Sequence, residues 1–184
     1  MKRICVYCGS KVGINGSYAE AATALGRSLA RRSCRLVYGG GSVGLMGRIA
    51  DVVLKGGGEV LGVIPRDLWQ RELGHRGLTE LVVVDDMHER KAFMAESAEA
   101  FVALPGAYGT LEELFEVIAW AQLEIHNKPV GLLNTNGYFD HLLSFLDHSV
   151  QEGFLREHHR DLLRVETDAE ALVDDLLAHM EAGR

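Results

Sequence analysis

The chain has 184 residues, of which 47% are hydrophobic and 24% charged, and its formal net charge is −7. This length suffices for one buried core and is short for two, so residues 1–184 are expected to form a single domain. The acidic balance argues against a nucleic-acid polymer or an anionic membrane as partner. No apolar run reaches the roughly 20 residues of a membrane span. Three cysteines without a secretory segment predict a cytoplasmic protein.

Short apolar runs alternate with amphipathic stretches along the chain. The apolar runs predict strands at residues 3–7, 35–38, 60–64, 81–84, 100–104, 130–133 and 163–165. Helical spacing predicts helices at residues 17–32, 45–54, 87–99, 110–122, 138–152 and from 168 onward, with Ser17 and Thr167 as N-caps. Short strands that are apolar on both faces indicate an α/β fold, a three-layer, Rossmann-like open parallel sheet with helices on both faces.

Polar or glycine-rich loops follow several of these strands. In a parallel sheet, ligands bind at the carboxyl ends of the strands, so these loops are expected to gather along one edge. They are Cys8-Gly9-Ser10, Gly39 to Gly44, Pro65-Arg66, the turn before Arg90, and Pro105 to Thr110.

The stretch from Leu104 to Glu113 is a glycine-rich turn from a strand into a helix. Such a turn leaves backbone N–H groups free at the helix N-terminus, where the dipole favours an anion. Gly106 and Gly109 allow the backbone to approach a ligand closely. The stretch therefore predicts a phosphate cradle with the carboxylate of Glu113 one turn into the helix. A purely structural alternative is a capping box formed by Thr110 and Glu113.

The helix after this turn is apolar on two sides. Its predicted core face consists of Leu111, Leu114, Phe115 and Ile118. Glu113 lies nearly opposite, beside Val117 and Trp120. A helix that is apolar on both sides is buried on both sides, so we expect the second face to meet another subunit. This predicts a homodimer with Glu113 near the subunit boundary.

Gly39-x-Gly41-x-x-Gly44 has the spacing of a dinucleotide-binding fingerprint. The fingerprint also requires an acidic residue at the end of the next strand. Glu59 lies at the wrong end of that strand, and Asp67 lies beyond a proline. The alternatives are a dinucleotide-dependent oxidoreductase, a ligand-contacting loop, and a tight turn needed for close helix packing.

Arg90 and Lys91 lie near the start of a helix, where the dipole disfavours positive charge. One interpretation is a solvated pair. At the strand-end edge, the pair could instead neutralise a phosphate or orient a leaving group.

Cys5-x-x-Cys8 has the spacing of a redox or zinc motif. Cys5 falls within a predicted strand, and no second pair of ligands has the spacing of a metal site, so neither function is favoured.

Two motifs and their surroundings resemble the Lonely Guy (LOG) family. Pro105 to Glu113 resembles the family signature P-G-G-x-G-T-x-x-E, and Met87 to Ala92 resembles its second motif. The resemblance spans Val6 to about Leu155 and includes Tyr38-Gly39-Gly40-Gly41 and Lys128 to Asn134.

The resemblance implies hydrolysis of the N-glycosidic bond of a purine nucleoside 5′-monophosphate, a cytokinin riboside 5′-monophosphate or AMP, to free base and ribose 5-phosphate. It implies Glu113 and Arg90 as catalytic residues. The substrate-binding residues expected from it are Gly106, Ala107, Tyr108, Gly109, Thr110, Glu112, Lys91, Glu72, Ser10 and Gly41. No metal or cofactor is expected. The label lysine decarboxylase, sometimes given to the family, finds little support, because nothing builds a pyridoxal site around Lys91. A non-catalytic nucleotide-binding module is the alternative function.

One position departs from the family signature. Ala107 replaces its second glycine, and a positive φ at this position would strain an alanine by roughly 1 kcal/mol or more. We expect the loop to tolerate the change, because Gly106 and Gly109 remain.

Overall fold

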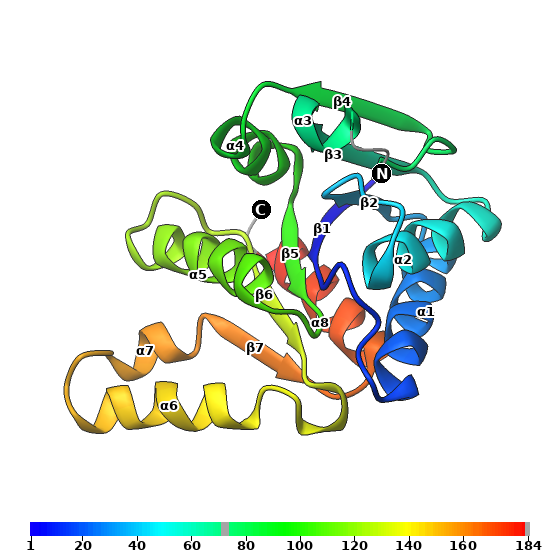
Figure 1. The fold of residues 1–184 in the computed structure, drawn as a ribbon. Helices are drawn as coiled ribbons and strands as arrows, with labels where there is room; N and C mark the ends of the chain where they lie inside the picture. The colour runs from blue at the N-terminus through cyan, green and yellow to red at the C-terminus, as the bar shows by residue number, and fades with distance from the viewer. Residues whose placement is uncertain (71–73, 183–184) are drawn as a thin grey trace.

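The computed structural model describes residues 1–70 and 74–182 (Figure 1). Within these ranges, seven strands form one parallel sheet in the order β4-β3-β2-β1-β5-β6-β7. The strands are β1 (Arg3–Tyr7), β2 (Arg35–Tyr38), β3 (Val60–Pro65), β4 (Glu80–Val84), β5 (Ala100–Ala103), β6 (Val130–Leu133) and β7 (Leu163–Glu166). The helices are α1 (Gly16–Arg31), α2 (Gly44–Lys55), α3 (Arg66–Gln70), α4 (Met87–Ser97), α5 (Tyr108–Gln122), η1 (Thr135–Gly137), α6 (Asp140–Gln151), α7 (Glu157–Arg160) and α8 (Ala169–Ala182).

The α/β prediction is confirmed, and each predicted strand matches the observed one to within a residue at either end. The reason is visible in the burial pattern. Strands β3, β5 and β6 are buried along their entire length because helices cover both faces of the sheet.

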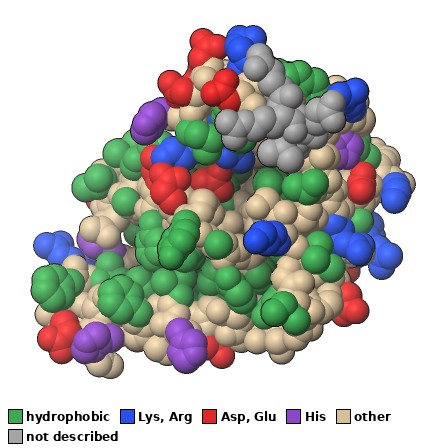
Figure 2. Space-filling view, in the orientation of Figure 1, with side chains coloured by type: hydrophobic (Ala, Val, Ile, Leu, Met, Phe, Trp, Pro, Cys, Tyr) green, Lys and Arg blue, Asp and Glu red, His purple; other side chains and the backbone are tan. Residues whose placement is uncertain are grey.

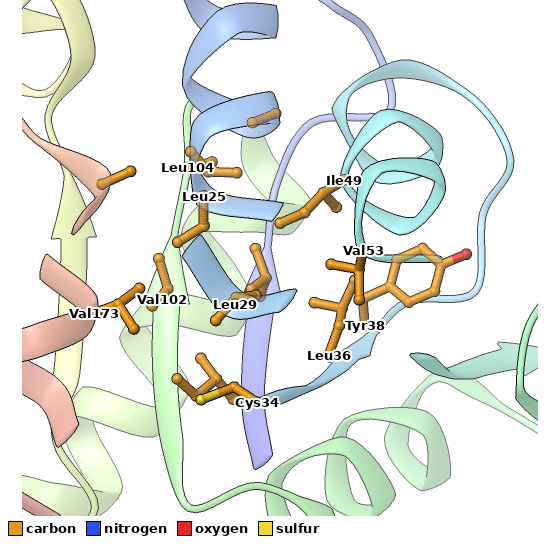
Figure 3. Close-up of a cluster of buried hydrophobic side chains, with 14 of the residues drawn as sticks. Leu25, Leu29, Cys34, Leu36, Tyr38, Ile49, Val53, Val102, Leu104 and Val173 are labelled. Carbon is orange, nitrogen blue, oxygen red and sulfur yellow. The ribbon is translucent and has the colours of Figure 1, made fainter. Parts of the chain in front are cut away.

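Two cores lie on opposite faces of the sheet. One is formed with α1, α2 and α8, and Figure 3 shows Leu25 and Leu29 of α1 beside Leu36 of β2 and Val102 of β5. The other core contains side chains from α4 and α5, with leucines of α6 packed at its margin. The molecule is therefore a helix–sheet–helix sandwich (Figure 1).

The order of strands places a switch point at the centre of the sheet. From β1 the chain proceeds outward through β2 and β3 to β4, then returns to β5, which pairs with β1 at Ile4 and Ala100. The loops that leave β1 and β5 therefore diverge to opposite faces and leave a crevice between them.

Two predicted N-caps are wrong. Helix α1 begins at Gly16, and the side chain of Asn15 accepts a hydrogen bond from the backbone N–H of Ser17. At α8, Asp168 accepts from the N–H groups of Glu170 and Ala171. The observed caps lie one or two residues from the predicted ones because Asn and Asp cap at least as well as Ser and Thr.

Leu114 of α5 is buried as predicted, and Leu111 and Ile118 pack against the same core, but the rest of the orientation predicted for α5 is wrong. Its buried residues are Thr110, Glu113, Leu114 and Val117, whereas Phe115 is 37% exposed. The side that carries Glu113 and Val117 thus faces the sheet of its own chain. Val117 is 1% exposed and cannot form the subunit contact predicted from the sequence.

Within the described residues, each helix is too short or too polar to cross a lipid bilayer.

Candidate active site

A cavity of about 410 Å³ opens at the switch point, beyond the carboxyl ends of β1 and β5. Three elements supply most of its wall: the loop after β1, the start of α2 and the turn into α5. Its lining residues are Cys8, Gly9, Ser10, Lys11, Val12, Gly13, Tyr18, Leu45, Met46, Met87, Arg90, Pro105, Gly106, Ala107, Gly109, Thr110, Glu112, Glu113 and Tyr138.

Backbone hydrogen bonds hold these three elements together. The N–H of Gly9 donates to the carbonyl of Pro105 at 3.0 Å, and the N–H of Leu45 donates to the carbonyl of Gly9 at 3.0 Å. Gly44 has a φ of +65°, and a Cβ at this position would collide with the backbone of Ser10. The third glycine of the fingerprint therefore serves close packing between two loops.

The N-terminus of α5 has free hydrogen-bond donors. Ala107 is the N-cap residue and provides no side-chain acceptor, so the first-turn N–H groups at Tyr108, Gly109 and Thr110 have no partner within the helix. Ala107 has a φ of −109°, so it does not adopt the positive φ at which an alanine in place of the signature glycine would be strained. The donors and the helix dipole together suit an anion.

Gly106 is the position in this turn where a side chain would not fit. A Cβ there would collide with the hydroxyl of Thr110 and lie 3.0 Å from the backbone nitrogen of Gly9. Thr110 is 4% exposed. Thr110 thus packs against the loop it follows and is the third residue of α5 rather than its N-cap residue, so the capping-box interpretation of Thr110 and Glu113 is wrong.

Glu113 and Arg90 form a buried ion pair at the cavity wall. Nη1 of Arg90 lies 3.5 Å from Oε1 of Glu113, and each side chain is 10% exposed. Burial raises the pKa of Glu113 to about 7, while the charge of Arg90 opposes this rise. A carboxyl with this pKa exchanges its proton near neutral pH.

The guanidinium of Arg90 is held from three sides. Its Nε donates to the carbonyl of Val63 at 3.2 Å, and Nη1 contacts the sulfur of Met87 at 3.7 Å. A Cβ at Gly39 would collide with Nη2, so the first glycine of the fingerprint leaves room for this side chain. The arginine reaches Glu113 in one fixed orientation.

Lys91 points to the acidic residues of α5. Its Nζ forms ion pairs with Glu112 and, at 3.1 Å, with Glu116. Arg90 and Lys91 are 8% and 9% exposed, so the interpretation as a solvated pair is wrong.

Most of the site residues expected from the resemblance lie together. The ones that line the cavity are Ser10, Arg90, Gly106, Ala107, Gly109, Thr110, Glu112 and Glu113. Lys91 and Gly41 lie outside the lining, and Tyr108 is 91% exposed. Gly41 instead accepts a hydrogen bond from the buried hydroxyl of Tyr38 at 3.1 Å. Glu72 lies outside the described residues.

Several lining residues were not among the site residues predicted from the sequence, notably Tyr18, Met87 and Tyr138. Tyr138 follows β6, whose carboxyl end lies at the same edge as those of β1 and β5. The strand-end rule, applied to every strand, could have identified it.

The cysteines are buried free thiols, and burial raises the pKa of Cys5 and Cys8 far above the usual range. Among the described residues, no three His, Cys, Asp or Glu side chains are placed to hold a metal ion.

Solved structures with the same architecture cover nearly the whole chain. The molybdenum cofactor binding protein of Rippkaea orientalis is 20% identical, with a TM-score of 0.73 over 97% of both chains. The Moco carrier protein of Chlamydomonas reinhardtii is 22% identical, with a TM-score of 0.73 over 100% of this chain and 99% of its own. These likenesses show the fold.

Sequence relatives are much closer. Residues 46–176 match the family described as "Possible lysine decarboxylase". Cytokinin riboside 5′-monophosphate phosphoribohydrolase LOG5 of Arabidopsis thaliana is 52% identical over 97% of this chain and 78% of its own length. The probable phosphoribohydrolase LOGL9 of Oryza sativa subsp. japonica is 55% identical over 95% and 77%. The chain therefore belongs to the LOG family of cytokinin riboside 5′-monophosphate phosphoribohydrolases.

Proposed function

We propose that the protein hydrolyses the N-glycosidic bond of purine nucleoside 5′-monophosphates. Water adds to C1′ of the ribose, the bond from C1′ to the base nitrogen breaks, and the base leaves with a proton. The products are the free base and ribose 5-phosphate. The observation that carries this proposal is the buried pair of Glu113 and Arg90, which lies on the same cavity wall as the uncapped N-terminus of α5.

The turn into α5 binds the 5′-phosphate. Its first-turn N–H groups donate to the phosphate oxygens, and the helix dipole stabilises the negative charge. The phosphate anchors the ribose beside Glu113, one helical turn further along. Binding energy from this remote group positions the reacting bond.

Glu113 acts on the ribose. Glycosidic cleavage passes through an oxocarbenium-like state, which an adjacent carboxylate stabilises. The same carboxylate accepts a proton from the attacking water. Arg90 keeps Glu113 in place and faces the leaving base from the cavity wall.

The base lies against the apolar part of the wall. Val12, Leu45, Met46 and Met87 line the cavity, and their side chains offer a surface for a purine ring and for an apolar N6 substituent. We therefore infer that AMP and its N6-prenylated form are both substrates.

The experiment measures release of free base from AMP and from N6-isopentenyl-AMP. Glu113→Gln keeps the shape of the side chain and removes its charge, and we expect the rate to fall by at least a hundredfold. The matched control is Glu96→Gln on α4, because Glu96 is exposed and absent from the cavity wall. Full activity of Glu113→Gln would refute the catalytic assignment. Nucleotide binding by the wild-type protein without base release would favour the non-catalytic module.

We also propose that the protein is a homodimer, assembled through a surface between α5 and α6. This α5–α6 patch consists of four residues that line a groove, Phe115, Ile118, Leu146 and Leu155, together with the exposed Phe145 of α6. Phe115 and Phe145 are 37% and 62% exposed, and Figure 2 shows hydrophobic side chains gathered over this region. Exposed phenylalanines beside partly buried apolar residues are typical of subunit interfaces.

The buried free thiols support a reducing compartment, so we place the protein in the cytoplasm.

A further inference from the structure

Tyr138 contacts the turn that precedes α5 from across the cavity. Its hydroxyl donates to the carbonyl oxygen of Gly106 at 2.6 Å, and its ring lines the cavity. We propose that Tyr138 is a positioning residue that fixes the orientation of the Gly106–Ala107 peptide for phosphate binding. The proposal rests on the phosphate-binding role given above to this turn.

The peptide between Gly106 and Ala107 presents a donor and an acceptor on opposite sides. The described residues contain no cis peptide bond, so the carbonyl of Gly106 and the N–H of Ala107 point in opposite directions. When the Tyr138 hydroxyl holds the carbonyl, it also determines where that N–H points. A flipped peptide would break the hydrogen bond from Tyr138 and reorient Ala107, the residue that leads into the first-turn N–H groups of α5.

Gly106 makes such control necessary. Contact with Thr110 excludes a side chain at this position, and a glycine has far more backbone freedom than any other residue. The turn therefore contains a residue that must be small and is consequently easy to reorient. A hydrogen bond from outside the turn restricts that freedom.

Tyr138 is presented by a stiff support. Buried Asn134 accepts a hydrogen bond from the N–H of Phe139 at 2.8 Å and donates one to Asp140 at 2.7 Å. The ring of Tyr138 packs edge-on against Tyr18 of α1, with ring centroids 5.5 Å apart. The hydroxyl is thus held in place from both its own turn and the opposite helix.

The test uses Tyr138→Phe, which keeps the ring and removes the hydroxyl. Loss of one hydrogen bond is expected to weaken the binding of ribose 5-phosphate by about two- to tenfold. Binding of free adenine, which has no phosphate, stays unchanged. Ser144→Ala is the matched control, because the Ser144 hydroxyl also donates to a backbone carbonyl, that of Asp140, on the exposed side of α6.

A second measurement separates positioning from direct contact with the phosphate. The backbone ¹⁵N–¹H resonance of Ala107 is recorded in the ligand-free protein. Positioning predicts that Tyr138→Phe shifts or broadens this resonance, whereas a hydroxyl that only contacts phosphate leaves it unchanged. An unchanged Ala107 resonance, or unchanged ribose 5-phosphate binding, overturns the proposal. If the proposed function itself is wrong, the wild-type protein releases no base, and this result is distinct from the two outcomes that overturn the role of Tyr138.

Discussion

Glu113 is subject to two opposing influences on its proton. Burial favours the neutral acid, and the guanidinium of Arg90 at 3.5 Å favours the carboxylate. Their balance leaves the pKa at about 7. The carboxylate, which the proposed reaction needs, is thus formed only as the pH rises through neutrality.

The pH dependence of the rate follows from this balance. We expect kcat/KM for base release to increase with pH and to level off above about 7, because the ionised fraction of Glu113 grows over that range. Arg90→Gln removes a positive charge that lowers the pKa of Glu113. The pH at which the remaining activity increases should therefore be higher than in the wild-type protein. A rate profile that is flat from pH 5 to 9 in the wild-type protein would contradict the assignment.

The same carboxyl affects stability with the opposite trend. Its folded-state pKa of about 7 exceeds the ordinary glutamate value of 4.5, so between these values the folded state binds more protons than the unfolded state. Its contribution therefore favours folding at low pH and is lost as the pH rises through about 7. The free energy of unfolding of Glu113→Gln, relative to that of the wild-type protein, should be higher at pH 8 than at pH 4 by up to about 3 kcal/mol. Urea unfolding at the two pH values measures this, and an equal difference at both would be inconsistent with a raised pKa.

Gly39 provides a test of the Arg90 geometry. Gly39→Ala adds a methyl group where the guanidinium lies, so the guanidinium of Arg90 must leave its observed position beside Glu113. We expect base release to fall at least tenfold, in line with a displacement of about 1 Å in a catalytic group. Gly16→Ala is the control, since a Cβ at Gly16 meets nothing within 4 Å. Wild-type rates in Gly39→Ala would show that Arg90 need not occupy its observed position.

At the scale of elements, the strands could be predicted from the sequence, and the orientation of α5 could not. A strand that is buried on both faces consists of a short continuous run of apolar residues, and such a run can be recognised in the sequence. Helix α5 carries apolar residues on two sides, so periodicity alone does not distinguish its inner from its outer face. In the structure, Glu113 faces inward and pairs with Arg90. This ion pair joins two distant segments of the chain, so the pattern of α5 alone does not reveal which face is buried.

Helix α8 offers a test of the observed caps. Asp168→Ala removes the acceptor for the N–H groups of Glu170 and Ala171 and should lower the free energy of unfolding by about 1 kcal/mol. Thr167→Ala, at the exposed residue before it, should change stability by less than about 0.5 kcal/mol. Denaturant titration of both variants checks the difference. A larger loss of unfolding free energy in Thr167→Ala than in Asp168→Ala would support Thr167 as the N-cap, as predicted from the sequence.

At the scale of the whole molecule, much of the cavity could be predicted because the strand-end rule concerns topology rather than side chains. Pro105 to Thr110 and Arg90 were located in this way. Tyr138 was missed because the rule was not applied to the loop after β6, and its role depends on a hydrogen bond to a backbone atom, which the rule does not address. Sequence patterns record side-chain types and contain little information about such contacts.

The α5–α6 patch makes a prediction about assembly. Phe145→Asp places a charge on an exposed residue of the patch, so the fold is retained and the dimer dissociates. Light scattering should then report half the wild-type mass. Ile14→Asp, at an exposed residue outside the patch, should leave the mass unchanged. A monomeric wild-type protein would refute the proposed dimer.

The central position of β1 has a consequence for synthesis on the ribosome. This strand leaves the ribosome well before its partner on one side, β5, which begins only at Ala100. Until then one edge of the strand has no neighbour, and a nascent chain with an unpaired apolar edge is prone to associate with others. Glu113 is translated after β5, so the active site can form only once β5 has been made. Until then, we expect chaperones to shield the unpaired edge of β1 from other chains.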